Sequence, residues 1–150
     1  GVYAVYTSDD TELPGVASGT DGLLYVGSAS DLRARVVDLH FGEKGSDFST
    51  LRRTIGALIR EQFGLQAIQR SPGSKTYQFK FSEESERRLS SWMRSHLQLA
   101  VYEHEVVEEI ESDLIRTLEP PLNLKGWSNP DRPRLLSLRK KCADEAASSN

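Results

Sequence analysis

Two short runs of strand-forming residues near the start of the chain constrain the fold more than any other feature. They read "GVYAVYT" at residues 1–7 and "LLYVG" at residues 23–27, and each contains a glycine and a tyrosine. Valine and tyrosine favour extended backbone, and the Gly-, Asp- and Ser-rich segment between the runs is typical of a surface loop. The sequence therefore predicts a β-hairpin. Tyr3 and Tyr25 are then either ordinary sheet residues or two parts of one site.

The rest of the chain alternates between helical and strand-like patterns. The next apolar residues recur at helical spacing behind Ser30 or Asp31, which are suitable caps. We expect the strand at 97–103 to be central in the sheet, Leu118 to face inward, and the closing residues 143–150 to fray. The expected elements are a helix from about 30 to 41, a helix from Ser49 to Phe63, a strand at 76–81, a helix after Ser82, the strand at 97–103, a helix at 106–118 and a last helix from Pro133 to about Ala143.

Length and composition place the chain among single globular domains. It has 150 residues, 37% of them hydrophobic, and a mean hydropathy of -0.49. No apolar run approaches the roughly 18 residues of a membrane span, so no membrane partner is expected. The single cysteine excludes an intrachain disulfide and favours the reducing cytoplasm. The chain begins at Gly1 without a methionine, which leaves room for a neighbouring or upstream binding domain.

Charge is distributed unevenly. The net charge of -3 argues against a dedicated nucleic-acid binder, whose domain is usually basic. Acidic residues nevertheless crowd residues 103–119, while two other segments are basic. This separation predicts either a cationic face beside an anionic pocket or ordinary solvated helix faces. The basic residues are Arg33, Arg35, Lys44, Arg52, Arg53 and Arg60 in the first segment, and Lys125, Arg132, Arg134, Arg139, Lys140 and Lys141 in the second.

The order of several short motifs resembles the GIY-YIG nuclease superfamily. "GVY" is followed by "YVG", by a helix that carries an arginine, and later by "ESDLIRTLEPPLN". The resemblance implies an α+β fold with a small central antiparallel or mixed sheet of about three strands flanked by helices. It also implies one nuclease domain over residues 1–150, with its core at about 1–41 and 98–124, an inserted helical segment at about 42–97, and a C-terminal helix and tail at about 125–150.

The resemblance also implies roles for particular residues. Tyr3 and Tyr25 match the tyrosines of the two motifs, which adjacent antiparallel strands would bring to one end of the sheet. Arg35 matches the catalytic arginine, Glu111 the metal-binding glutamate and Asn123 the terminal asparagine. Asn123 could fix a loop or contact the scissile phosphate through its amide.

These residue types suit phosphodiester hydrolysis on chemical grounds. One carboxylate with several waters is a typical way to hold Mg²⁺, or Mn²⁺ in its place, and Glu111 supplies it. The planar fork of Arg35 suits phosphate oxygens. Tyr25 is a poor base unless a cation lowers its pKa, which Arg35 or the metal could do.

One position departs from the family pattern. Many members carry a histidine or tyrosine one helical turn after the arginine, where this chain has Leu39 with His40 beside it. Either the helix is overwound so that His40 takes that catalytic role, or the role is absent. His40 is then the rival of Tyr25 as the general base. We further expect contacts with nucleic-acid phosphates from Arg33, Arg52, Arg53 and Lys125.

Each assignment has a structural alternative. The tyrosines could be sheet residues, Arg35 could pair with Asp31 or Asp38, and Glu111 could belong to a solvated face. The leading hypothesis is a metal-dependent endonuclease that acts on DNA in preference to RNA. The alternatives are a catalytically silent nucleic-acid-binding module on the same fold, and a domain that docks protein partners through its acidic helix and basic tail.

Overall fold

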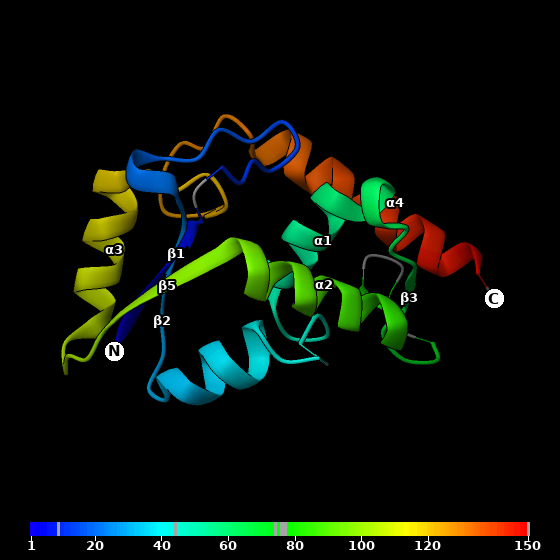
Figure 1. Ribbon diagram of the computed structural model, residues 1–150, viewed down its shortest axis with the longest axis horizontal. Helices are drawn as coiled ribbons and strands as arrows, with labels where there is room; N and C mark the ends of the chain where they lie inside the picture. The colour runs from blue at the N-terminus through cyan, green and yellow to red at the C-terminus, as the bar shows by residue number, and fades with distance from the viewer. Residues whose placement is uncertain (9, 44, 74, 76–77, 150) are drawn as a thin grey trace.

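The computed structural model describes residues 1–8, 10–43, 45–73, 75 and 78–149. The predicted residues Lys44, Thr76 and Tyr77 lie outside these ranges, so only part of the strand expected at 76–81 is described. Figure 1 shows the elements in chain order. They are β1 (Val2–Thr7), a 3₁₀ turn η1 (Thr20–Gly22), β2 (Leu23–Ser28), a π-helix η2 (Arg33–His40), α1 (Thr50–Phe63), β3 (Ala67–Gln69), β4 (Phe79–Phe81), α2 (Glu83–His96), β5 (Leu97–Tyr102), α3 (Val107–Leu118) and α4 (Arg132–Ser148).

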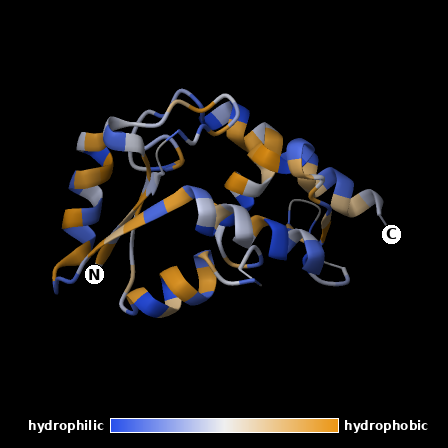
Figure 2. Ribbon diagram, in the orientation of Figure 1, coloured by the Kyte–Doolittle hydropathy of each residue, from blue (hydrophilic) through white to orange (hydrophobic). Residues whose placement is uncertain are grey.

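A three-stranded antiparallel sheet forms one end of the molecule, in the order β2-β1-β5. This arrangement, with helices around it, confirms the predicted α+β class. The expectation that the strand at 97–103 is central is wrong, because β1 occupies the centre and β5 is an edge strand. The side chains of Leu99, Val101 and Tyr102 are 42%, 60% and 59% exposed. Strand β5 is nevertheless partly orange in Figure 2, and its apolar residues Leu99 and Val101 reflect β-propensity on a solvated strand rather than burial.

Helix α3 packs on β2 and β1. Ile115 is its buried residue and contacts a small cluster that includes Val2, Leu23 and Val26. Leu118 does not face inward as expected, since it is 40% exposed in the last turn before the left-handed Glu119 ends the helix.

The main core extends from the sheet, where Val5 and Leu24 are buried, into the other end of the molecule. Helix α1 begins at the predicted cap, where Ser49 accepts a hydrogen bond from the backbone N–H of Arg52, and it packs on α4. The two-stranded antiparallel sheet of β3 and β4, of which β3 was not predicted, also contacts α4. Helix α4 continues to Ser148, because Cys142 and Ala146 are buried against this core. The expectation that the closing residues fray is therefore wrong.

Arg52 corrects another expectation. We expected it to contact nucleic-acid phosphates, but its side chain is fully buried and its Nη2 lies 2.6 Å from Oε2 of Glu86 on α2. The same guanidinium donates to the carbonyl oxygen of His40 and to Oγ of Ser90. A guanidinium enclosed in this way cannot reach a phosphate, so Arg52 is a core residue that ties α1 to α2.

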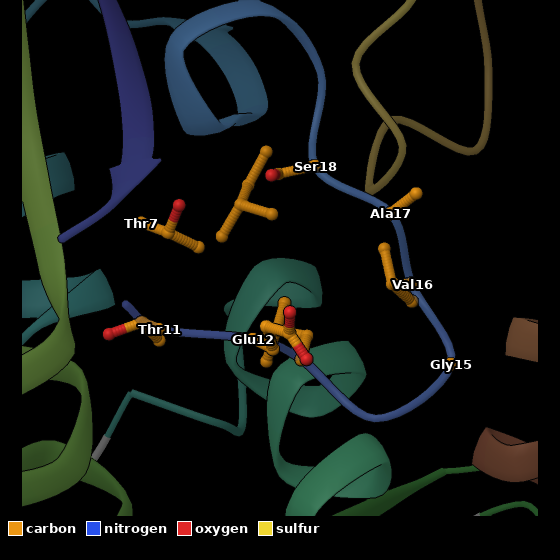
Figure 3. Close-up of a pocket in the computed structure, with 9 residues that line it drawn as sticks. Thr7, Thr11, Glu12, Gly15, Val16, Ala17 and Ser18 are labelled. Carbon is orange, nitrogen blue, oxygen red and sulfur yellow. The ribbon is translucent and has the colours of Figure 1, made fainter. Parts of the chain in front are cut away.

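No helix that the described residues form is long and apolar enough to cross a membrane. The loop between β1 and β2 encloses a hollow of about 550 Å³, shown in Figure 3, lined by residues such as Thr7, Glu12 and Val16. Its lining contains none of the predicted site residues.

Candidate active site

The hairpin register explains the glycine of the second motif. Tyr3 on β1 lies opposite Gly27 on β2, and a Cβ atom added to Gly27 would lie only 2.5 Å from the Tyr3 hydroxyl oxygen. The glycine therefore leaves the space that the Tyr3 ring fills. Tyr25, two residues before Gly27, has its ring centroid 6.1 Å from that of Tyr3. The sheet thus brings the two phenols together, as predicted.

A π-helix brings His40 to these tyrosines. The backbone N–H of Phe41 donates to the carbonyl oxygen of Val36 at 3.0 Å, which is the i→i+5 pattern of a π-helix. This wider turn places His40, rather than Leu39, one turn after Arg35. The helix is therefore underwound, not overwound as we expected. His40 is buried, with its Nε2 2.6 Å from the Tyr3 hydroxyl.

Ser49 completes a chain of hydrogen bonds behind Tyr3. Its Oγ lies 2.7 Å from Nδ1 of His40 and also accepts from the backbone N–H of Arg52 at 3.1 Å. The N-cap of α1 therefore also orients the imidazole ring. Sequence reasoning identified Ser49 as a cap, but its link to His40 had no signal in the spacing.

Burial dominates the electrostatics of this group. It raises the pKa of Tyr3 and Tyr25 above the usual value for a phenol and lowers the pKa of His40 to about 4. Arg35 is exposed on η2, and its charge lowers the pKa of both phenols and of His40. Arg35 therefore acts on Tyr25 in the expected direction, but burial outweighs its charge and the pKa of Tyr25 stays above its ordinary value.

Glu111 lies across the sheet from this group, on α3. Oε2 of its half-buried carboxylate accepts a hydrogen bond of 2.5 Å from Oγ of Ser28, the residue after Gly27. Ser28 was not predicted as a site residue, although it directly follows the second motif. Its hydroxyl fixes the orientation of the carboxylate, and Oε1 has no hydrogen bond or ion pair to any described residue.

Asn123 joins the loop after α3 to the free edge of β2. Its amide oxygen accepts from the backbone N–H of Val26 at 2.9 Å, and its amide nitrogen donates to the carbonyl oxygen of Val26 at 2.8 Å. Both ends of the buried amide are thus engaged with the backbone of Val26, which favours the expected alternative in which Asn123 fixes a loop. Asn123 is a positioning residue that holds the loop against the sheet.

A cleft of about 460 Å³ connects these parts. Tyr25 and Glu111 line it together with Asn123. Three cations line the same cleft, namely Lys125 in the following loop and Arg132 and Arg139 on α4. Of these only Lys125 was predicted to contact phosphate. Arg33, also predicted, lines a different hollow that includes Glu103 and Glu105.

No group of three or more His, Cys, Asp or Glu side chains that could hold a metal ion occurs among the described residues. Among the residues that line the cleft, Glu111 is the one that carries a carboxylate. This donor set fits Mg²⁺, which retains several of its own waters, better than it fits an ion that needs an all-protein cage.

One phenol, a carboxylate and three cations thus line a cleft at the edge of an antiparallel sheet, and the buried phenol of Tyr3 lies next to the first. A family model for the GIY-YIG catalytic domain matches residues 1–141, which is most of the chain. The protein therefore belongs to the GIY-YIG family. Searches against curated proteins and solved structures gave no significant match.

Proposed function

We propose that this protein is a divalent-metal-dependent endonuclease that hydrolyses phosphodiester bonds in DNA. The observation that carries the proposal is the cleft, in which the phenol of Tyr25 and the carboxylate of Glu111 lie with the cations Lys125, Arg132 and Arg139. An anionic backbone would be attracted by the cations, and the two other groups match the two needs of hydrolysis: a metal ligand and a group that handles a proton.

Glu111 would hold the metal ion through Oε1, with Oε2 kept in place by Ser28. The bound ion would supply charge stabilisation at the phosphate and leaving oxygens. The hydrogen bond to Ser28 would restrain rotation of the carboxylate away from the cleft.

Arg35 would bind the non-bridging oxygens of the scissile phosphate. It forms no ion pair with a carboxylate of the described residues, so the pairing with Asp31 or Asp38 that we considered is not found there. Its charge acts on Tyr3, Tyr25 and His40, which supports this role. A guanidinium so placed offers two parallel donors to one phosphate.

Tyr25 would take the proton from the attacking water, because it lines the cleft and His40 does not. As its oxygen accepts that proton, it would pass its own to Tyr3, with which it interacts, and Tyr3 would pass its proton to Nε2 of His40. Nδ1–H of the imidazole would donate to Ser49 throughout. The relay leaves a hydroxide at the phosphate and an imidazolium in the interior. Because burial lowers the pKa of His40 to about 4, the imidazolium would be transient and would return its proton along the same chain once the bond to the leaving oxygen breaks.

The proposal is tested by incubating the protein with supercoiled plasmid, branched DNA, single-stranded DNA and RNA. Each substrate is offered with Mg²⁺, with Mn²⁺ or with a chelator, between pH 6 and 9. We expect cleavage of DNA with metal only. An absence of cleavage under all conditions would favour the catalytically silent module on the same fold.

A further inference from the structure

Three arginines from separate elements converge beside the cleft. Arg53 lies in the first turn of α1, Arg70 directly follows β3, and Arg139 lies in the middle of α4. Both α1 and β3 pack on α4, so the three side chains are brought together although they are distant in sequence. Each is half-buried. After burial, the charges of Arg139 and Arg70 are the main causes that lower the pKa of Arg53 to about 10.

The positive charge of this group is not neutralised within the described part of the chain. None of the three arginines forms an ion pair with a carboxylate there. Nε of Arg53 is buried without a hydrogen-bond partner among these residues. Asp47 is the acid whose charge acts on Arg53, and its carboxylate also faces Lys80 at 3.9 Å. Half-buried like charges are costly unless an anion is bound, which indicates a site for phosphate groups.

An exposed aromatic ring lies at the outer end of the group. Phe48 is 66% exposed, and the guanidinium carbon of Arg70 lies 4.5 Å from the centre of its ring. Arg70 covers one face of the Phe48 ring, so the exposed part of the side chain includes the rest of the ring. A phenylalanine that is exposed beside cations is a stacking platform for an unpaired base, because every base has a π-face.

The arginines and the ring are continuous with the cleft. Arg139 and Thr50, the first residue of α1, both line it. Phe48 is two residues before Thr50, and Arg53 is three residues after it. A strand that leaves the cleft past Arg139 therefore reaches Arg53, Arg70 and Phe48 in turn.

We propose that Arg139, Arg53, Arg70 and Phe48 form a track for single-stranded DNA next to the cleavage site, with the arginines on successive phosphates and one unpaired base on Phe48. The inference rests on the proposed function for the nature of the ligand. A duplex would not offer an unpaired base to the ring, so the track predicts that the enzyme prefers DNA with a single-stranded segment beside the scissile bond.

The test measures binding without cleavage. Fluorescence anisotropy of labelled single-stranded DNA, blunt duplex and RNA of the same sequence is recorded in a chelator, over a range of salt concentrations. The variants are Phe48→Ala, Phe48→Tyr, and the triple variant Arg53→Gln, Arg70→Gln and Arg139→Gln. A charge-matched control replaces three exposed arginines that are each paired with a carboxylate, namely Arg87, Arg88 and Arg116, by glutamine. Thermal unfolding verifies that each variant is folded.

We expect the triple variant to reduce the salt slope of single-strand affinity by about 2, because each lost phosphate contact contributes about 0.7. Phe48→Ala should weaken single-strand binding about tenfold and leave duplex binding unchanged, whereas Phe48→Tyr should retain affinity. The control triple variant should keep most of the salt slope of single-strand affinity.

Any of three results would overturn the track. The two triple variants could show equal salt slopes of single-strand affinity, Phe48→Ala could bind single-stranded DNA as tightly as the parent protein, or the parent protein could fail to bind it. Tighter binding of RNA than of DNA would overturn its assignment to DNA. A parent protein that binds through the track but never cleaves would refute the proposed function alone. If the parent protein cleaves DNA, but Phe48→Ala and the triple arginine variant bind single-stranded DNA as the parent does, the track alone is refuted.

Discussion

The hydroxyl of Tyr3 lies 2.6 Å from Nε2 of His40, and this contact joins the central strand of the sheet to the π-helix. Both groups are buried, and the other imidazole nitrogen is bonded to Ser49. The imidazole is thus held neutral between two hydroxyl groups. This relationship affects both the stability of the fold and the chemistry of the cleft.

Stability should depend on pH through His40. Its pKa falls from 6.5 in ordinary surroundings to about 4 in the fold, because the charged form is desolvated. Below pH 6.5 the unfolded chain binds a proton that the folded chain does not bind until about pH 4. The contribution of His40 to the free energy of unfolding therefore falls by up to about 3 kcal/mol across this window as pH decreases.

Urea unfolding at pH 7 and pH 4 checks this prediction with His40→Gln, whose amide can still bond to Tyr3 and Ser49. The parent protein should lose more stability than the variant between the two pH values, by up to about 3 kcal/mol. The difference between the two proteins removes the contribution of other titrating groups. Equal losses would show that His40 does not titrate as its burial indicates.

Glu111→Ala should abolish metal-dependent cleavage and change the free energy of unfolding by less than about 1 kcal/mol, because the carboxylate is half-exposed and forms one side-chain contact. Glu109→Ala, at an exposed position on the same helix, is the control and should cleave normally. A Glu111→Ala variant that cuts as fast as the parent would exclude Glu111 as the metal ligand.

Ser28→Ala tests whether Ser28 orients the carboxylate of Glu111 for metal binding. Loss of its hydrogen bond to Oε2 of Glu111 should raise the Mg²⁺ concentration needed for half-maximal cleavage, about tenfold or more, with a smaller effect at saturating metal. An unchanged metal dependence would mean that the hydroxyl has no part in orienting the carboxylate.

Arg35→Ala should lower turnover about a hundredfold, the usual cost of losing one charged donor at a developing negative charge. Arg35→Lys should restore part of the activity, because an ammonium retains the charge and lacks the planar fork. Arg87→Ala, an exposed arginine on α2, controls for the change in net charge. Full rescue by lysine would show that only the charge is needed.

The motifs predicted the sheet and the position of the tyrosines because those features depend on local spacing. A hairpin register follows from two alternating runs, and Gly27 opposite Tyr3 follows from the register. The family pattern also led to Glu111, which lines the cleft. These parts of the site are determined within short segments or within one pair of strands.

The remaining features depend on contacts between distant segments. The periodic spacing of apolar residues along the sequence does not predict such contacts. The π-helix that brings in His40 differs from an α-helix by one residue per turn, which the apolar spacing does not resolve. Arg139 lies on the last helix, and its place in the cleft depends on how α4 packs on α1. The bidentate bond of Asn123 to Val26 likewise joins residues that are far apart in sequence.

Arg52 shows how charge misleads a sequence-based reading. It follows Leu51 in a helix with other arginines, yet it is buried with Glu86. Arg52→Ala should cost about 3–5 kcal/mol of stability by leaving Glu86 buried without its partner, whereas replacing both residues by apolar ones should cost less. Arg60→Ala on the same helix breaks a partly exposed pair with Glu145 and should cost about 1 kcal/mol or less. Similar losses at the two positions, measured by urea unfolding, would contradict the distinction.

The last prediction concerns the proton acceptor. Tyr25 lines the cleft, while His40 is buried behind Tyr3, so only Tyr25 can contact the attacking water. Tyr25→Phe should therefore abolish cleavage at every pH from 6 to 9, while Mg²⁺ binding measured by calorimetry persists. His40→Ala should lower the rate only in part, because Tyr25 can still pass a proton to solvent at alkaline pH.

Tyr3→Phe provides the matched control for the relay, since it keeps the ring over Gly27 and removes the hydroxyl between Tyr25 and His40. It should resemble His40→Ala, with a rate that recovers toward the parent value as pH rises, because alkaline solvent replaces the lost acceptor. The pH–rate profiles of the variants are compared at saturating Mg²⁺. If Tyr25→Phe stays active and His40→Ala is inactive at every pH, the imidazole itself takes the proton from water, and the buried position of His40 must open before the chemical step.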